Sequence, residues 1–125
     1  MLLAYVSGGT KNTERLVGLL GHDSLDLDTI DTIGMEPIDR PFLLVVPSYE
    51  DNPFYDILAD VLDADEGVGN CKGIIGTGNK NFNDLYLVTA KELSREYDLP
   101  IVADVEFFGT ESDRERVNDV IDFLD

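Results

Sequence analysis

Four short apolar runs, separated by stretches with helical spacing, constrain the fold more than any other feature of this chain. The runs are Leu2–Val6, Phe42–Val46, Gly73–Gly76 and Ile101–Val105. Each is apolar at nearly every position, which is typical of strands buried on both faces. A weaker run at Leu25–Leu27 predicts a short edge strand. Strands that alternate with helices form a parallel sheet covered on both faces, so we expect an α/β fold.

The segments between these runs carry the start signals and the one-face spacing of helices. Asn52 followed by Pro53 predicts a helix start, because asparagine caps a helix and proline suits its first position. Apolar spacing predicts another helix within residues 84–97. Ser112 and Glu115 have the spacing of a capping box, which predicts the start of the last helix.

Length and charge limit the classes of function. The 125 residues fit one domain, which we assign to residues 1–125. Asp and Glu total 26 against 9 Lys and Arg, a net charge of -17 that argues against nucleic-acid or anionic-membrane partners. Cys71 is the only cysteine, so no internal disulfide forms and a reducing compartment is favoured. With no apolar span or secretory leader, we expect a cytoplasmic protein, and we take a monomer as the default.

The loops beyond the carboxyl ends of the strands are the expected binding region, because ligands of open parallel sheets bind there. They are residues 7–13, 47–52, 77–83 and 108–112. The first loop is rich in glycine and hydroxyl groups and precedes a helix, whose free N–H groups and dipole favour a phosphate. A plain helix cap remains the alternative, and the loop has neither a Walker A nor a GxGxxG pattern. Its candidate binding residues are Ser7, Gly8, Gly9, Thr10, Lys11, Asn12 and Thr13.

The second and third loops suit a planar aromatic ligand. In the second loop, Tyr49 offers a ring for stacking beside backbone groups that hydrogen-bond the ligand's edge, although a solvated polar loop is the alternative. The third loop, taken together with Gly76 directly before it, combines two glycines with three asparagines, which suits the rim of a heteroaromatic ring as well as an ordinary turn. The fourth loop places aromatic residues near the same edge. The candidate residues of the second and third loops are Ser48, Tyr49, Glu50, Asp51, Asn52, Gly78, Asn79, Asn81 and Phe82.

Other chemistries lack their residues in this sequence. His22, the only histidine, lies at a helix end and is interpreted as a C-terminal cap, which leaves no catalytic triad or dyad. The acids are spread along helix faces without the clustering of a metal site. A phosphoryl-accepting receiver domain needs acidic residues where this chain has Ser7-Gly8 and Pro47-Ser48. We therefore predict no catalytic residue and no metal site, but a bound aromatic cofactor with one phosphate.

The same motifs make the chain similar to the flavodoxin-like NrdI family, the flavin proteins that accompany class Ib ribonucleotide reductase. The likeness rests on residues 12–15, 46–49, 73–82 and 107–110. It implies a doubly wound, five-stranded flavodoxin-like sheet that holds FMN non-covalently. It further implies that Gly8–Thr13 hold the phosphate, while Ser48–Asn52 and Gly78–Phe82 flank the isoalloxazine ring.

The resemblance also implies a function. It points to a redox accessory flavoprotein rather than a stand-alone enzyme, served by a flavin-reducing electron donor. In the family the reduced flavin reacts with oxygen, and the oxidant passes to a dimanganese centre in the small subunit of the reductase to form a tyrosyl radical. A general one-electron carrier and a cofactor-free interaction domain remain alternatives. This chain departs from the flavodoxin phosphate loop at Lys11, where a glycine is usual, and has Glu50-Asp51-Asn52 where many members are rich in glycine.

Overall fold

The sheet has five parallel strands in the order β2-β1-β3-β4-β5. The computed structural model describes residues 1–7, 11–28, 37–48, 54–64 and 67–125, with the backbone alone for 82–84. The five-stranded α/β fold expected from the sequence is confirmed. The strands are β1 Leu2–Tyr5, β2 Ser24–Asp26, β3 Phe42–Val46, β4 Cys71–Gly78 and β5 Ile101–Glu106.

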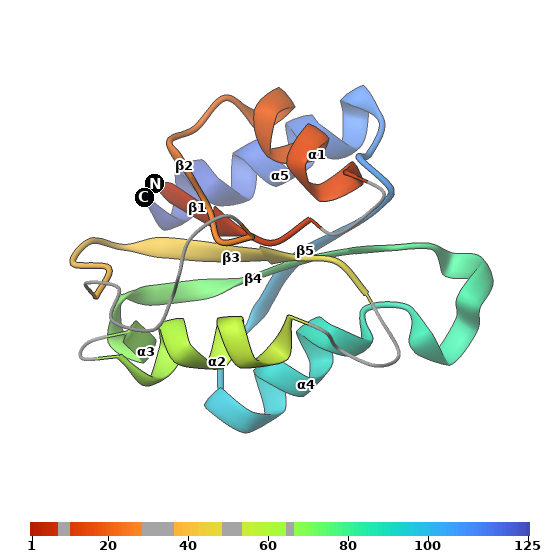
Figure 1. The fold of residues 1–125 in the computed structure, drawn as a ribbon. Coiled ribbons are helices and arrows are strands. Elements are labelled where there is room, and N and C mark those ends of the chain that lie inside the picture. The colour runs from red at the N-terminus through yellow and green to blue at the C-terminus, as the bar shows by residue number, and fades with distance from the viewer. Residues whose placement is uncertain (8–10, 29–36, 49–53, 65–66) are drawn as a thin grey trace.

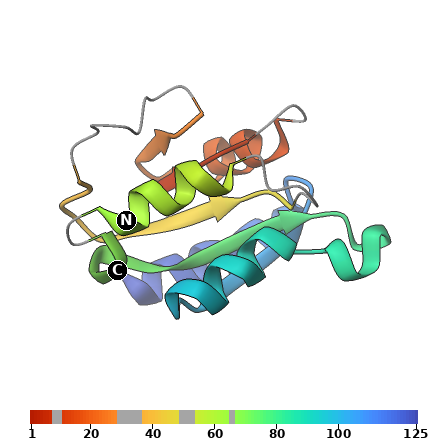
Figure 2. The ribbon, with the colours of Figure 1, turned by 60° about the horizontal axis from the view of Figure 1, so that its bottom comes forward.

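Helices cover both faces of the sheet. Figures 1 and 2 show α1 and α5 on one face and α2, α3 and α4 on the other. The two chain ends lie side by side, and the Met1 ammonium pairs with the Asp125 carboxylate at 3.1 Å. The helices are α1 Asn12–Leu20, α2 Tyr55–Asp63, α3 Gly67–Asn70, α4 Val88–Tyr97 and α5 Glu111–Leu124, with a 3-10 helix, η1, at Lys80–Leu85.

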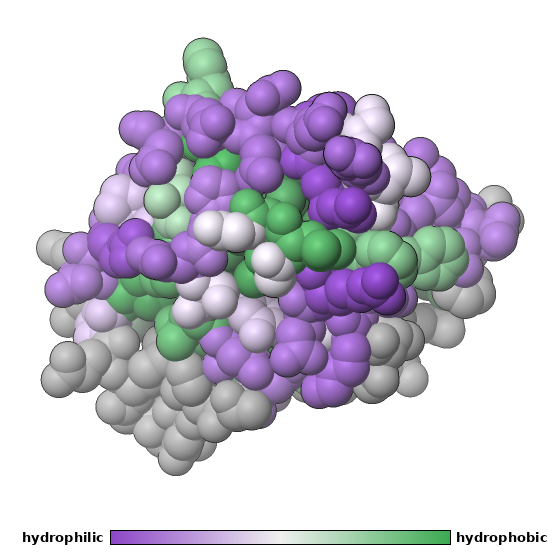
Figure 3. All heavy atoms as spheres, turned by 90° about the horizontal axis from the view of Figure 1, so that it is seen from above, coloured by the Kyte–Doolittle hydropathy of each residue, from purple (hydrophilic) through white to green (hydrophobic). Residues whose placement is uncertain are grey.

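The position of β3 at the centre of the sheet explains why its sequence is apolar throughout. All five residues of β3 are buried. Because side chains alternate across a strand, Leu44 and Val46 pack in the core beneath α2 and α4, while Leu43 and Val45 pack beneath α1 and α5. The outer side of the α1 and α5 layer faces water and is mostly hydrophilic, with apolar atoms gathered near its middle (Figure 3). No helix in the described part of the chain is long and apolar enough to cross a membrane.

Strand β4 is longer than the sequence indicates. It extends from Cys71 to Gly78, so Gly78, which was predicted to lie in the loop, belongs to the strand together with Gly76. Because these glycines lack a side chain, residues at the start of α4 can pack closely against the strand. A Cβ on Gly76 would lie 2.6 Å from Leu87 Cδ2. The predicted helix within 84–97 in turn begins only at Val88, because Leu87 has a φ of 61° that does not continue a helix.

Two predicted helix caps are wrong, and a third lies outside the described residues. The capping box of α5 pairs Thr110 with Asp113 rather than Ser112 with Glu115. Helix α1 ends at Gly21, whose φ of 79° gives the left-handed cap, whereas the predicted cap His22 hydrogen-bonds instead to Asn118 Oδ1 of α5 at 2.8 Å. The caps were misplaced because capping depends on the φ and ψ angles as well as on residue type. The start predicted at Asn52-Pro53 is not among the described residues.

Candidate cofactor site at the carboxyl edge of the sheet

The ends of β1, β3, β4 and β5 lie along one edge because all the strands are parallel. From β1 the chain continues to β2 on one side, while β3 lies on the other, so strand order reverses between β1 and β3. This switch point is where open α/β sheets bind ligands. Ser7 follows β1 and Ser48 follows β3, which puts one predicted site residue on each side of it.

Ser7 connects the end of β1 with two neighbouring segments. Its side chain is buried, and its Oγ accepts a hydrogen bond from the backbone N–H of Glu14 at 3.1 Å. Ser7 therefore caps the first turn of α1 from outside the helix. Its own N–H donates to Asp28 Oδ2 at 2.8 Å. The predicted residues Gly8, Gly9 and Thr10 lie outside the described part of the chain.

Lys11 has an unusual backbone conformation directly before α1. Its φ of 61° and ψ of 13° lie in the left-handed region, which glycine adopts without strain and lysine does not. The glycine that the resemblance leads us to expect at this position would adopt the conformation without strain. The residue is exposed, so the chain carries a positive charge at the start of α1 on an acidic protein.

The predicted residue Thr13 points into the protein. Its side chain is buried, and its Oγ1 lies 3.0 Å from the Oγ1 of Thr77, at the end of β4. Asn12 beside it is half-buried. The first turn of α1 is therefore tied to β4, on the far side of β3.

Ser48 holds the end of β3 against two other segments. Its Oγ donates to the carbonyl oxygen of Thr77 at 2.6 Å and accepts from the N–H of Leu87 at 2.9 Å. Because the single hydroxyl hydrogen is donated inside the protein, Ser48 has none to donate to a ligand. Its role is to hold the strand ends that border the site. The predicted residues Tyr49, Glu50, Asp51 and Asn52 lie outside the described part of the chain.

The turn after β4 is held by hydrogen bonds that backbone N–H groups donate. Asn79 Oδ1 accepts from the N–H of Asn81 at 2.9 Å, the pattern of an Asx turn. The N–H of Lys80 donates to Glu106 Oε2 at 3.2 Å, and the N–H of Phe107 donates to Gly78 O at 2.9 Å. These bonds therefore tie the ends of β4 and β5 together. The backbone of Phe82 lies in η1, and its side chain is outside the described atoms.

Tyr86 supports this turn from the α4 side. Its hydroxyl donates to Asp104 Oδ2 at 2.7 Å, and the Lys80 ammonium lies 5.8 Å from the centre of its ring. Burial raises the pKa of Tyr86 above its usual value, and the hydrogen bond and charge of Asp104 add to this rise. The phenol therefore stays protonated at neutral pH and remains a donor to Asp104.

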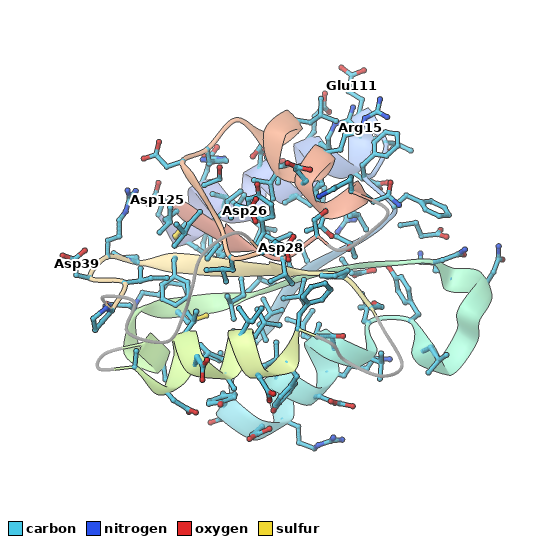
Figure 4. The ribbon with its side chains drawn as sticks, viewed as in Figure 1. Arg15, Asp26, Asp28, Asp39, Glu111 and Asp125 are labelled. Atoms are coloured by element: carbon cyan, nitrogen blue, oxygen red, sulfur yellow. The ribbon has the colours of Figure 1, made fainter. Side chains whose placement is uncertain are left out.

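The fourth loop forms an open hollow of about 330 Å³ beside the edge, lined by residues 106–110 and by Asp113. Phe107, at a φ of 54°, is 47% exposed. The guanidinium of Arg15 lies 4.0 Å from the centre of the Phe108 ring, a cation–π contact between α1 and this loop. Figure 4 places Arg15 and Glu111 at the same end of the α1 and α5 layer.

Comparison with known proteins identifies the family to which a chain with this fold and this site belongs. The model of the NrdI flavodoxin-like family matches residues 3–119. The chain belongs to this family. It is 35% identical over 99 residues to a putative NrdI-like protein of Streptococcus pyogenes serotype M18, covering 68% of this chain and 62% of that protein. It is 30% identical over 117 residues to the protein NrdI of Rhizobium johnstonii, covering 90% and 86%. The chain thus spans about three fifths of the streptococcal relative's length.

The solved structures support the same fold. Oxidised flavodoxin 1 of Bacillus cereus matches with a TM-score of 0.58 at 16% identity, covering 98% of this chain and 93% of that one. The resemblance predicted from the sequence is therefore confirmed at the level of family and fold. Membership of the NrdI flavodoxin-like family identifies FMN as the cofactor. The NrdI family is associated with ribonucleotide reductase.

The residues at the carboxyl edge fit such a cofactor. A phosphate needs local positive charge on this acidic chain, and the exposed Lys11 at the start of α1 supplies it. The side-chain amides of Asn79 and Asn81, beside β4, suit the polar rim of a flavin. Asp28 Oδ1, next to Ser7, is buried with no hydrogen-bond partner among the described residues, and its carboxylate is a group at this edge that disfavours a phosphate. In the described part of the chain, no group of three His, Cys, Asp or Glu residues could hold a metal ion.

Sequence reasoning missed three residues that organise this edge of the NrdI-family chain. Thr77 lies within the third loop predicted from the sequence, but a threonine carries no local signal of a site beside glycine and asparagine residues. Asp104 has the signal of a carboxylate in an apolar strand, which requires a buried partner. Asp28 carries no local signal, since it is one of 26 acidic residues.

Proposed function

We propose that this chain is an FMN-binding redox protein that activates the small, radical-bearing subunit of a class Ib ribonucleotide reductase. The observation that carries the proposal is a NrdI-family chain with a positively charged helix start at the switch point of its sheet. When bound, FMN would supply the redox chemistry, namely the electrons for reduction of oxygen to the oxidant that serves dimanganese-tyrosyl radical assembly in the partner.

The phosphate is held by residues Ser7, Gly8, Gly9, Thr10, Lys11, Asn12 and Thr13. The physical support is electrostatic. On a chain of net charge -17 a phosphate experiences repulsion, which a nearby ammonium and the helix N-terminus offset. Ser7 contributes by capping Glu14 from the β1 side, which fixes where the helix starts.

The isoalloxazine ring is flanked by the segments after β3 and β4, residues Ser48, Tyr49, Glu50, Asp51, Asn52, Gly78, Asn79, Asn81 and Phe82. Within this set the described residues have distinct roles. Ser48 holds the two strand ends in register, and the side-chain amide of Asn79 is oriented by the hydrogen bond that it accepts from the backbone N–H of Asn81. The two segments thereby shape a slot for a flat ring.

The test is an anaerobic reductive titration of the full chain reconstituted with FMN, followed by the manganese-loaded small subunit and then oxygen. We expect tyrosyl radical, detected by electron paramagnetic resonance, at a yield well above that obtained with free reduced FMN. A yield equal to that of free reduced FMN contradicts the proposal, and reduction of several unrelated acceptors in the same assay favours a general electron carrier. A chain that takes up no FMN contradicts it more directly and favours a cofactor-free interaction domain.

A further inference from the structure

A pair of buried threonine hydroxyls joins the two halves of the candidate cofactor site. Thr13 Oγ1 and Thr77 Oγ1 lie 3.0 Å apart, although the residues are 64 positions apart in the sequence. Their side chains are only 1% and 2% exposed. Thr13 belongs to the half that holds the phosphate under the proposed function, and Thr77 to the strand that flanks the ring.

The pleat of β4 explains why these two side chains meet. Ile75 packs in the core beneath α1 and α5, and Thr77, two positions later, points to the same face. Leu16 and Val17, from the same helix as Thr13, pack in that core as well. The hydroxyl pair therefore sits at the border of an apolar layer, where a lone hydroxyl would carry an uncompensated cost.

Thr77 also contacts the end of β3. Its Oγ1 donates to the carbonyl oxygen of Val46 at 3.4 Å, and its own carbonyl oxygen accepts from Ser48 Oγ at 2.6 Å. With its hydrogen directed to Val46, the Thr77 hydroxyl accepts the hydrogen of Thr13. One residue thus sets the positions of both α1 and the end of β3 relative to β4.

We propose that Thr77 is a positioning residue, which holds the phosphate-binding turn of α1 in register with the ring-flanking ends of β3 and β4. The inference rests on the proposed site and adds a residue to it. FMN spans both halves, so its affinity depends on their register. Riboflavin has the same ring but no phosphate, and its affinity depends on the ring half alone. The ratio of FMN affinity to riboflavin affinity therefore reports how well the phosphate half and the ring half of the site are aligned.

The experiment compares FMN and riboflavin binding to the FMN-free full chain by quenching of flavin fluorescence. Thr77→Val removes the hydroxyl while keeping the shape of the side chain. We expect an FMN association constant lower by about fivefold, the effect of losing one buried hydrogen bond. Riboflavin binding should stay within measurement error of wild type, and Thr77→Ser should retain the wild-type preference for FMN.

Thr13→Val and the double variant Thr13→Val/Thr77→Val show whether the pair acts as a unit. Because both single variants remove the same bond, the double variant should weaken FMN binding no more than Thr77→Val does. The double variant also leaves no buried hydroxyl unpaired, so it tests the idea if a single variant folds poorly. Thr89→Val is the matched control: Thr89 is a buried threonine on α4, and its loss should leave the ratio of FMN to riboflavin affinity unchanged.

Three results would overturn the inference: an unchanged FMN affinity in Thr77→Val, an equal loss for FMN and riboflavin, or additive losses in the double variant. These results differ from failure of the proposed function. That failure appears as a wild-type chain that binds neither flavin, or as one that binds FMN but yields no radical in the partner subunit. If the chain binds FMN but yields no radical, the ratio of FMN affinity to riboflavin affinity still tests whether Thr77 aligns the two halves of the site.

Discussion

Gly78 and Ser48 pack so closely across β4 and β3 that no side chain fits on Gly78. A Cβ atom there would lie 2.8 Å from Ser48 Oγ and 3.0 Å from Tyr86 Cδ1. Ser48 cannot turn away without loss, because its hydroxyl is bonded to both Thr77 and Leu87. The glycine is therefore required by packing inside the protein, apart from any contact with a cofactor.

We expect Gly78→Ala to lower the free energy of unfolding by roughly 1–3 kcal/mol, the usual cost of overpacking. Urea unfolding of the FMN-free chain measures this loss. Gly69→Ala is the control, since a Cβ at Gly69 meets nothing within 4 Å in α3, and alanine there should be neutral or stabilising. Equal stability of Gly78→Ala and wild type would show that the contact is not restrictive.

The left-handed conformation of Lys11 predicts opposite effects on stability and cofactor binding. Lys11→Gly should raise the free energy of unfolding of the FMN-free chain by roughly 1 kcal/mol, because only glycine adopts this conformation without strain. The same change should weaken FMN binding severalfold through loss of the ammonium. Urea unfolding and fluorescence titration measure the two effects.

Gly21 provides the control for the strain at Lys11. It has a φ of 79° at the other end of α1, and a Cβ there meets nothing within 4 Å. Gly21→Ala should therefore cost stability through backbone strain alone, with no effect on FMN binding. If Lys11→Gly is destabilising, or leaves FMN affinity unchanged, the assigned role of Lys11 is wrong.

Asp28 places a negative charge one hydrogen bond away from the proposed phosphate site, through the N–H of Ser7 at 2.8 Å. Asp28→Asn keeps a side-chain oxygen that accepts this bond and removes the charge. We expect FMN to bind a few times more tightly, with an advantage that shrinks as salt is added. Isothermal titration calorimetry at two salt concentrations measures both.

Asp39→Asn is the matched charge control for Asp28. Asp39 is exposed and precedes β3, at the opposite edge of the sheet, well away from Asp28 in Figure 4. This variant should leave FMN affinity nearly unchanged at moderate salt, because salt screens an exposed charge at the opposite edge of the sheet from the site. Tighter binding in both variants to the same degree would mean that net charge, rather than the position of Asp28, sets the effect.

Tyr97 makes stability depend on pH in the alkaline range. Its hydroxyl donates to Asp63 Oδ1 at 3.0 Å and so links α4 to α2. Burial, the hydrogen bond to Asp63 and its charge together raise the pKa of Tyr97 to about 12. A raised pKa means that the folded chain holds this proton more tightly than the unfolded chain. The stabilisation is complete below the ordinary pKa of 10 and is lost as pH rises towards 12.

Tyr97→Phe isolates this contribution. The difference in free energy of unfolding between wild type and the variant should be greatest at pH 8 to 9 and should shrink between pH 10 and 12. Urea unfolding across this range measures it, and comparison of the two proteins cancels the contributions of the other tyrosines. A difference that does not change with pH would mean that the hydroxyl acts only through packing.

Features encoded in short segments were predictable. The buried strands follow from runs such as Phe42–Val46, since a strand covered on both faces must be apolar at every position. The parallel sheet follows from strands alternating with helices, and the carboxyl edge follows from the sheet. The likeness to the NrdI family rested on motifs of the same short range.

The tertiary structure decided where individual groups point. The sequence shows hydroxyls at Thr13 and Thr77, but their contact depends on α1 crossing the end of β4. It shows glycines at positions 76 and 78, which suit a turn as well as they suit a strand packed against Leu87 and Ser48. Local composition limits which backbone angles are allowed, whereas contacts between distant segments select among them. Fold class was therefore set by the sequence pattern, and the detailed roles of these side chains by packing.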